Sequence, residues 1–286
     1  IGPTGCGIEV DEPTGHWIES GGAALAGKLS GMAIDRAVDL ARRGDVQGIV
    51  TAPIDKSALF AGGYNYPGHT EMLADLTGSD VAMMLAAVRP SGGEGSNPLR
   101  VVLATTHIAL REVSDQLSQD SIIRIARITR EYLTLWFGLS EPRIALCALN
   151  PHAGDGGRFG DEDDRVLSPA ATRAGIAGPF PADTVFVRAI RGEFDAVIAP
   201  YHDVGMTAIK VASFGSAVNV TLGLPFPRTS PDHGTAIDIA GRGIADPASF
   251  TEALLLCRQI LLRDPRNAGR PLSEGQPPVS RSAVRP

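Results

Sequence analysis

The chain contains a series of short apolar runs that are nearly continuous. A strand with one solvent-exposed face would instead alternate polar and apolar residues. Residues 143–150, for example, read RIALCALN, and residues 195–200 read DAVIAP. The full series is 48–52, 81–88, 100–106, 143–150, 195–200 and 217–223. Strands buried on both faces are typical of a largely parallel sheet covered by helices, so the sequence predicts an α/β fold.

Segments with helical periodicity accompany these runs. Apolar residues recur at helical spacing from Leu25 to Leu40, and Gly44 stands where such a helix would stop. A second amphipathic helix is expected between Ser118, a good N-cap residue, and Gly138. From position 264 onward the chain lacks periodicity and is rich in proline, serine and arginine, so we expect residues 264–286 to form a disordered tail.

Three of the six histidines come directly after predicted strands. His107 follows VVLATT, His152 follows IALCALNP and His202 follows AVIAPY. Open parallel sheets bind ligands at the carboxyl ends of their strands, and neutral imidazole is the commonest protein ligand for a divalent metal. Three imidazoles with a fourth position left for substrate would form a catalytic type of metal site. The alternative is that each histidine only hydrogen-bonds its own loop.

Other polar residues are expected near the same edge. His69 and Thr70 follow a Pro-Gly turn, where Thr70 either presents its side chain to a ligand or caps the next helix. Two further segments supply Asp203, Lys210, Asn219, Arg228, Asp232 and His233. An arginine fork together with a lysine point charge suits a phosphate ester, although a lone cation is usually a solvated surface charge.

Composition and missing motifs exclude several classes of protein. The net charge of −6 indicates no nucleic-acid partner and no attraction to a membrane surface, and no apolar run approaches the ~20 residues of a membrane span. Cys6, Cys147 and Cys257 are widely spaced and form no CxxC pair, which favours the reducing cytoplasm over a disulfide framework. No GxGxxG fingerprint follows a strand and opens a helix, and Walker, HExxH and GxSxG motifs are absent.

Six segments of the chain, taken in order, resemble the 4-hydroxythreonine-4-phosphate dehydrogenase family of pyridoxal phosphate biosynthesis. They are YPGHTEMLADLTG, LATTHIALREV, LNPHAGDGGRFGDED, GPFPADTVF, YHDVGMTAIK and NVTLGLPFPRTSPDHGTAIDIAGRG. The resemblance implies an α/β fold like that of the isocitrate and isopropylmalate dehydrogenases, with two α/β/α domains and a cleft between them. It also implies a homodimer with shared active sites that binds NAD or NADP and one divalent ion (Zn, Mg or Co).

The resemblance also implies a division of the chain into domains. The first domain would comprise residues 1–65 with 215–263, and the second, which carries the metal histidines, residues 66–214. Family members usually begin with a strand and a Gly-Asp-Pro-x-Gly-Ile-Gly-Pro-Glu segment. That segment is not in this chain, so we expect the first domain to lack its amino-terminal part.

Site residues follow from the same resemblance. The metal ligands would be His107, His152 and His202, shared between two subunits across their interface. Substrate would be bound by His69, Thr70, Lys210, Asn219 and Arg228. Catalytic roles fall to His69, Asp203 and Lys210, and Asp183 also matches a family position near the site. The acceptor of the substrate's hydroxyl proton stays open between His69, Asp203 and a metal-bound water, and the residues that bind the nucleotide are not assigned.

The implied reaction is metal-dependent oxidation of 4-phosphooxy-L-threonine by NAD(P), in pyridoxine 5'-phosphate biosynthesis. The product, 2-amino-3-oxo-4-phosphooxybutanoate, decarboxylates to 3-amino-2-oxopropyl phosphate. Dehydrogenases of 4-phospho-D-threonate or 4-phospho-D-erythronate share the same metal and phosphate residues and remain an alternative. A metal-dependent phosphoester hydrolase and a non-catalytic phosphoester-binding protein are more distant ones.

Overall fold

The computed structural model describes residues 22–88, 97–213 and 216–267 of the chain. The longer helices are α2 (Gly22–Arg43), α4 (His69–Thr77), α6 (Gln119–Phe137), α8 (Ala182–Ile190), α9 (His202–Ser213) and α10 (Ala248–Arg263). Shorter ones are α3 (Lys56–Ala61), α5 (Val113–Gln116) and α7 (Ser168–Ala174). The strands are β1 (Ile49–Val50), β2 (Ala82–Ala87), β3 (Arg100–Leu103), β4 (Ile144–Cys147), β5 (Ala177–Phe180), β6 (Ala196–Ala199), β7 (Ala217–Leu222) and β8 (Arg228–Pro231).

The strands form one sheet in the order β1-β8-β7-β2-β3-β6-β4-β5. The expected α/β class is confirmed, but the expectation of a largely parallel sheet is wrong. The pairs β2/β3, β2/β7 and β7/β8 are antiparallel, while β1/β8, β3/β6, β4/β6 and β4/β5 are parallel. Continuous apolar runs report burial on both faces and not strand direction, and a short connection such as residues 223–227 between β7 and β8 permits only the antiparallel arrangement.

Helices cover both faces of the sheet, so side chains alternate between two cores. On one face Met84, Val102 and Ile198 pack with residues of α6, α7 and α10. On the other face Leu85, Val101 and Val197 pack with residues of α8 and α9. The strands are therefore apolar on both faces, which explains the continuous runs seen in the sequence.

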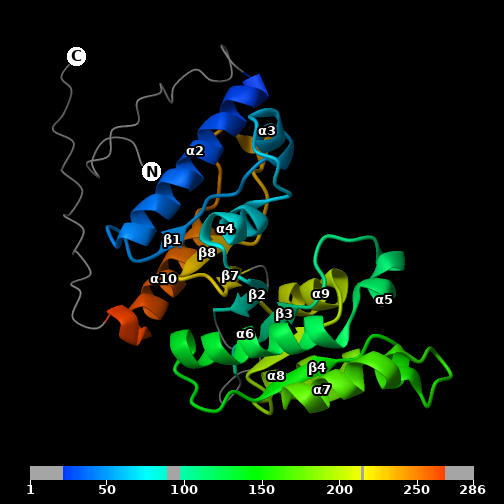
Figure 1. Cartoon of the computed structure of the whole chain (residues 1–286). Coiled ribbons are helices and arrows are strands. Elements are labelled where there is room, and N and C mark those ends of the chain that lie inside the picture. Colours follow the sequence, from blue (N-terminus) through cyan, green and yellow to red (C-terminus); the bar gives the residue numbers. More distant parts are fainter. Residues whose placement is uncertain (1–21, 89–96, 214–215, 268–286) are drawn as a thin grey trace, which may run out of the picture.

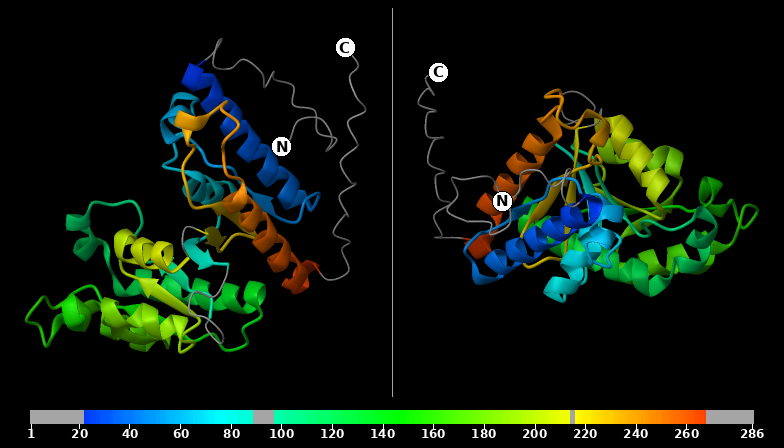
Figure 2. Two further views of the ribbon diagram at one scale, coloured as in Figure 1. Left: turned by 180° about the vertical axis from the view of Figure 1, so that it is seen from behind. Right: turned by 90° about the horizontal axis from the view of Figure 1, so that it is seen from above.

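The elements gather into two groups at the two ends of the sheet (Figures 1 and 2). One group contains α2, α3, α4 and α10 around β1 and β8, and the other contains α5 to α9 around β3 to β6. A third apolar cluster, which includes Ile34, Met72 and Phe226, fills the first group. The expected division into two domains stays a prediction, since the hydrogen-bonded sheet continues through both groups.

The local signals in the sequence place the helices well. The helix α6 begins after Ser118, whose hydroxyl accepts from the Ser121 N–H, and it ends at Gly138, where φ is 70°. Two strands were missed: β5 reads AGPF and β8 reads RTSP, and neither has the apolar run of the others. The start of the polar tail was also misjudged, because Asp264 is 3% exposed and accepts a hydrogen bond from the Trp136 indole at 3.2 Å. A 3-10 turn covers Pro265–Asn267, and residues 268–286 lie outside the described part of the chain.

Within the described ranges, no helix is both long and apolar enough to span a bilayer.

Candidate active site

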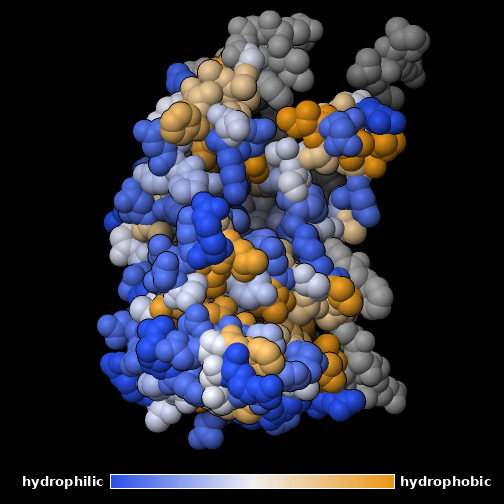
Figure 3. Space-filling model, turned by 90° about the vertical axis from the view of Figure 1, so that its right-hand side faces the viewer, coloured by the Kyte–Doolittle hydropathy of each residue, from blue (hydrophilic) through white to orange (hydrophobic). Residues whose placement is uncertain are grey.

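A pocket of about 370 Å³ lies where the two groups of elements meet. Its walls come from the loop after β1, the start of α4, the helix α9, and the strands β7 and β8. Figure 3 shows a hollow between the two groups, with hydrophobic and hydrophilic residues side by side around it. Nine of the polar residues expected at the site line this pocket: His69, Thr70, His107, His202, Lys210, Asn219, Arg228, Asp232 and His233.

Arg228 is the most deeply buried of these residues. Arg228 is the first residue of β8 and is 2% exposed. The guanidinium donates to the hydroxyls of Thr51, at 2.6 Å, and Thr221, at 3.1 Å, while its buried Nε has no hydrogen-bond partner among the described residues. Burial lowers the pKa of Arg228 to about 10, which still leaves the group charged at neutral pH. A buried cation with unused donors is suited to receive an anionic ligand.

His69 lies beside this cation. It is the first residue of α4, directly after Gly68. Burial, together with the charge of Arg228, lowers the pKa of His69 to about 3, so its imidazole is neutral at physiological pH. The side chain of Thr70 lines the pocket, and no side chain caps this helix, so the alternative that Thr70 serves as the N-cap is wrong.

Two other polar side chains, those of Asn219 and Lys210, line the same pocket as Arg228. The Oδ1 atom of Asn219 is buried and has no partner among the described residues. The ammonium of Lys210, on α9, donates to the Asp232 carbonyl at 3.4 Å and lies 3.8 Å from the Asp232 carboxylate. Burial raises the pKa of Asp232. Arg228 and Lys210 thus share the pocket with the amide of Asn219, the neutral imidazole of His69 and the carboxylate of Asp232.

His107 and His202 form a pair in the wall of the pocket, with ring centroids 5.6 Å apart. They follow β3 and β6, which are parallel neighbours, so the expected convergence at the carboxyl edge is observed for these two. The Nδ1 atom of His202 lies 2.7 Å from the Asp203 carboxylate, which leaves Nε2 as the nitrogen available to a metal. Desolvation and the charge of Lys56 lower the pKa of His107, which favours the neutral imidazole that metals bind.

His152 does not join this pair within one chain. It lies in the loop after β4, with a left-handed φ of 54°, and it is exposed and does not line the pocket. No group of three or more His, Cys, Asp or Glu side chains in the described part of the chain is arranged to hold a metal ion. A single chain therefore presents two of the three expected metal ligands together and the third on a separate loop.

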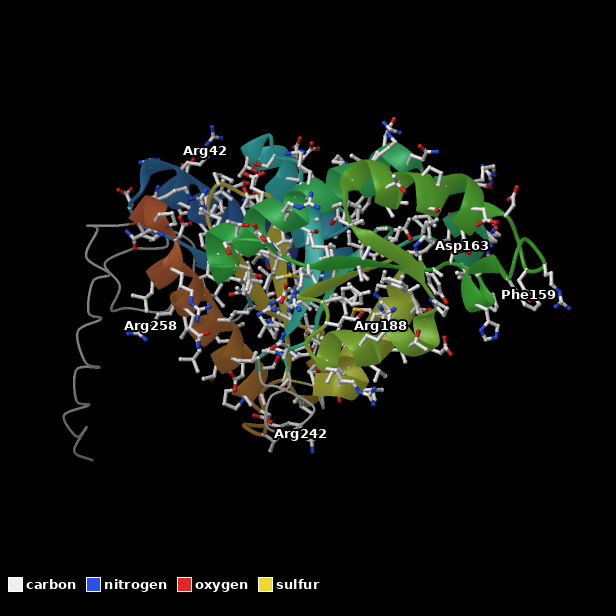
Figure 4. The ribbon with its side chains drawn as sticks, turned by 90° about the horizontal axis from the view of Figure 1, so that it is seen from below. Arg42, Phe159, Asp163, Arg188, Arg242 and Arg258 are labelled. Carbon is white, nitrogen blue, oxygen red and sulfur yellow. The ribbon has the colours of Figure 1, made fainter. Side chains whose placement is uncertain are left out.

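The loop that carries His152, residues 150–161, projects from the body of the protein, and we call it the His152 arm. Figures 1 and 2 show it as the green loop that extends beyond the helices, and Figure 4 shows Phe159 at its outer end. Its base is anchored by Asp163, which is 1% exposed and accepts from the N–H groups of Leu149 and Asn150, both at 2.9 Å. Glu162 accepts from the Asn150 amide at 2.8 Å and the Ser114 hydroxyl at 2.8 Å. These bonds hold the arm in one orientation.

Some pocket residues were missed or misplaced from the sequence. Lys56 and Glu71 line the pocket, although neither was singled out. Lys56 comes shortly after the expected strand 48–52, so the argument that selected the histidines would have found it, and Glu71 directly follows His69 and Thr70 in the segment after the Pro-Gly turn. Asp183 lies at the start of α8 and Asp203 is exposed, and neither lines the pocket of its own chain.

Comparison with known proteins shows the family of the chain. The family model described as "Pyridoxal phosphate biosynthetic protein PdxA" matches residues 16–257. The chain belongs to the PdxA family. The family inferred from the six sequence motifs is thus confirmed.

The PdxA relatives are similar over most of the chain. The 4-hydroxythreonine-4-phosphate dehydrogenase of Beijerinckia indica subsp. indica is 47% identical over 256 residues, which cover 86% of this chain and 72% of that protein. The D-threonate 4-phosphate dehydrogenase of Salmonella typhimurium is 45% identical over 260 residues, which cover 88% of this chain and 76% of that protein. The crystal structure of 4-hydroxythreonine-4-phosphate dehydrogenase from Klebsiella pneumoniae has a TM-score of 0.75 at 42% identity, covering 88% of this chain and 77% of that one.

Proposed function

We propose that the protein is a metal-dependent dehydrogenase that oxidises 4-phosphooxy-L-threonine with NAD or NADP. The observation that carries the proposal is the buried, charged Arg228 with its unpaired Nε, in the same pocket as Lys210 and the pair of histidines. A phosphate dianion satisfies both cations, since an arginine fork and a lysine point charge are common phosphate ligands. Relatives named 4-hydroxythreonine-4-phosphate dehydrogenase support the choice of substrate.

The proposed metal ligands are His107, His202 and His152 of the partner subunit in a homodimer with shared active sites. The pairing of His107 with His202 supports this assignment, and so does the anchored arm that carries the remaining histidine away from its own pocket. The hydrogen bond from His202 to Asp203 is the outer-shell arrangement common among metal-binding histidines. A divalent ion bound here (Zn, Mg or Co) supplies a Lewis acid that favours loss of the substrate's hydroxyl proton.

The residues of the pocket have different proposed roles. Lys210, Asn219 and Arg228 bind and orient the phosphate end of the substrate, with Thr70 beside them in the wall. His69 is the proposed proton acceptor because it is neutral and lies in the pocket, whereas Asp203 is exposed and bonded to His202. Phosphate bound at Arg228 offsets the charge that disfavours protonation of His69, so substrate binding raises the pKa of this imidazole. The proposed catalytic role of Lys210 is to stabilise negative charge that develops on the substrate.

An alternative substrate class rests on a specific observation. The Salmonella typhimurium relative named D-threonate 4-phosphate dehydrogenase is as similar in coverage as the others. A 4-phospho-D-threonate or 4-phospho-D-erythronate carries the same phosphate and hydroxyl groups and differs at the carbon that bears the amine.

The proposed compartment is the cytoplasm, supported by the buried free thiols of Cys147 and Cys257.

A substrate panel tests the proposal. Each phosphorylated acid is incubated with NAD or NADP and an added divalent metal, and nicotinamide reduction is followed by absorbance while phosphate release is measured in parallel. The proposal expects reduced nicotinamide with 4-phosphooxy-L-threonine at the highest kcat/KM and no release of inorganic phosphate. Phosphate release without nicotinamide reduction would instead indicate a hydrolase, and tight binding without turnover would indicate a binding protein.

A further inference from the structure

The guanidinium of Arg228 is held by two hydroxyl groups and by no carboxylate. Thr51 accepts from Nη2 at 2.6 Å and Thr221 accepts from Nη1 at 3.1 Å. None of the ion pairs between described residues involves Arg228. Both threonines are buried, with 8% and 0% exposure, so solvent does not compete for these bonds.

The two hydroxyls come from opposite sides of the strand that carries the arginine. Arg228 begins β8, which pairs with β1 on one side and with β7 on the other. Thr51 directly follows β1, where its N–H bonds the Thr229 carbonyl at 3.1 Å, and Thr221 lies within β7. A β-branched side chain on a fixed strand has few accessible rotamers, so each hydroxyl is itself held in place.

Other arginines of the same chain are held differently. Arg143 is paired with the Asp195 carboxylate at 3.0 Å, and Arg266 with that of Asp264 at 2.6 Å. A carboxylate fixes an arginine but also neutralises it, which removes its attraction for a second anion. A hydroxyl oxygen fixes the same planar group and leaves its full charge available.

We propose that Thr51 and Thr221 are positioning residues that orient the guanidinium of Arg228 toward a phosphate ester without neutralising it. The inference rests on the proposed phosphate-binding function of Arg228 and adds a specificity device to it. The neutral hydroxyl oxygens fix the orientation of the guanidinium, whose charge no carboxylate neutralises, so a phosphate ester in the pocket meets the full charge of Arg228. The strength of phosphate binding therefore depends on the uncharged character of two residues that need not touch the ligand.

The test compares substitutions that keep the shape of each threonine with others that keep its hydroxyl. Thr51→Val and Thr221→Val remove the oxygen, whereas Thr51→Ser and Thr221→Ser retain it. Thr129→Val is the matched control, since Thr129 is 0% exposed and its hydroxyl bonds the Ile125 carbonyl within α6. Inorganic phosphate is the probe: its dissociation constant is measured by calorimetry on the full chain, alongside the KM and kcat for the phosphorylated substrate.

We expect each valine substitution to weaken the binding of inorganic phosphate about tenfold, because a hydrogen bond that orients Arg228 is lost. For the same reason, each should raise KM more than it lowers kcat. The serine variants and the Thr129→Val control should bind phosphate like the wild type. Thr51→Asp offers a further check if a valine variant does not fold. Its carboxylate would pair with Arg228, and we expect a loss of phosphate affinity larger than that of Thr51→Val.

Two results would overturn the inference in different ways. Wild-type phosphate affinity in both valine variants or in Thr51→Asp, together with a loss in Arg228→Ala, would show that the arginine binds phosphate without help from its neighbours. Unchanged phosphate affinity in Arg228→Ala itself would mean that the proposed phosphate site is wrong, and the positioning role would fall with it.

Discussion

His107 and His202 lie with their ring centroids 5.6 Å apart, while His152, the third histidine that follows a strand, stands outside their pocket on a projecting arm. The strand order explains this separation. The strands β3 and β6 are adjacent, and β4 lies beyond them, so the segment after β4 begins one strand farther from the pocket.

Two inactive variants should restore activity when their subunits are mixed. His107→Ala and His152→Ala each remove one proposed metal ligand, so each homodimer should lose metal and activity. In a mixed dimer, one site would combine an intact His107 with an intact partner histidine, because the proposed site takes these two ligands from different chains. Random mixing should therefore recover about a quarter of the wild-type activity.

The measurement is enzyme activity and metal content after the two variants are unfolded together and refolded. Mixing His107→Ala with His202→Ala is the control, because these two ligands come from the same chain and no mixed dimer contains a complete site. Equal recovery in both mixtures, or no recovery in either, would contradict a site shared between subunits.

Replacing Arg228 by alanine should weaken the use of phosphorylated substrate by about 2 to 4 kcal/mol in kcat/KM, as expected for a charge-assisted contact in a desolvated site. The dephosphorylated analogue should lose much less. Arg258→Ala, at an exposed position on α10, is a suitable control. Similar losses with both compounds would indicate that Arg228 maintains the fold and does not recognise phosphate.

The depressed pKa of His69 should make the protein sensitive to acid. The pKa of His69 is about 3 in the folded state, against 6.5 for a free imidazole. Between pH 6.5 and 3, the imidazole is therefore protonated in the unfolded chain and neutral in the folded chain. The free energy of unfolding should therefore fall as the pH is lowered from 6.5 toward 3.

Urea unfolding at a series of pH values measures this effect. The free energy of unfolding of the His69→Gln variant should decrease less steeply over that range than that of the wild type. The control is His233→Gln, at an exposed residue of the same pocket, whose pH dependence should match that of the wild type. Inorganic phosphate should also reduce the slope, because an anion beside Arg228 raises the pKa of His69. Identical slopes for wild type and His69→Gln would exclude a buried neutral imidazole at this position.

Removing the anchor of the His152 arm should affect both stability and metal binding. Asp163→Ala leaves two backbone N–H groups without their acceptor, so we expect a loss of about 2 to 4 kcal/mol in the free energy of unfolding. Asp161→Ala is the control, since its carboxylate makes only an exposed pair with Arg165, worth less than about 1 kcal/mol. Metal affinity should fall in the first variant and not in the second. Undiminished metal affinity in a folded Asp163→Ala variant would show that the anchor does not position His152.

Much of this architecture could be read from the sequence, and the exceptions have physical causes. Apolar runs located six strands because burial on both faces leaves a continuous pattern. They missed β8, because its buried residues Arg228 and Thr229 are polar and make hydrogen bonds to the Thr221 hydroxyl and the Ala253 carbonyl. Strand direction was also invisible, since an apolar run reads the same in a parallel or an antiparallel pair.

The candidate site was likewise predictable from the sequence only in part. The position of a histidine after a strand predicted that His107 and His202 would meet, because adjacent parallel strands end at one edge. The hydroxyl partners of Arg228 could not be predicted, as Thr51 and Thr221 are 177 and 7 residues away in sequence and ordinary in composition. Contacts of this kind depend on which strands become neighbours, and that order is a property of the whole sheet.

The unbroken ladder between β2 and β7 has a mechanical consequence. Six residues of each strand pair across the middle of the sheet, from Ala82 with Leu222 to Ala87 with Ala217, and the pocket lies over this region. A hinge would have to break these bonds, so the two ends of the molecule are stiffly coupled. We therefore expect the pocket to adjust to substrate through twisting of the sheet and through small shifts of α4 and α9, the helices that carry His69 and Lys210.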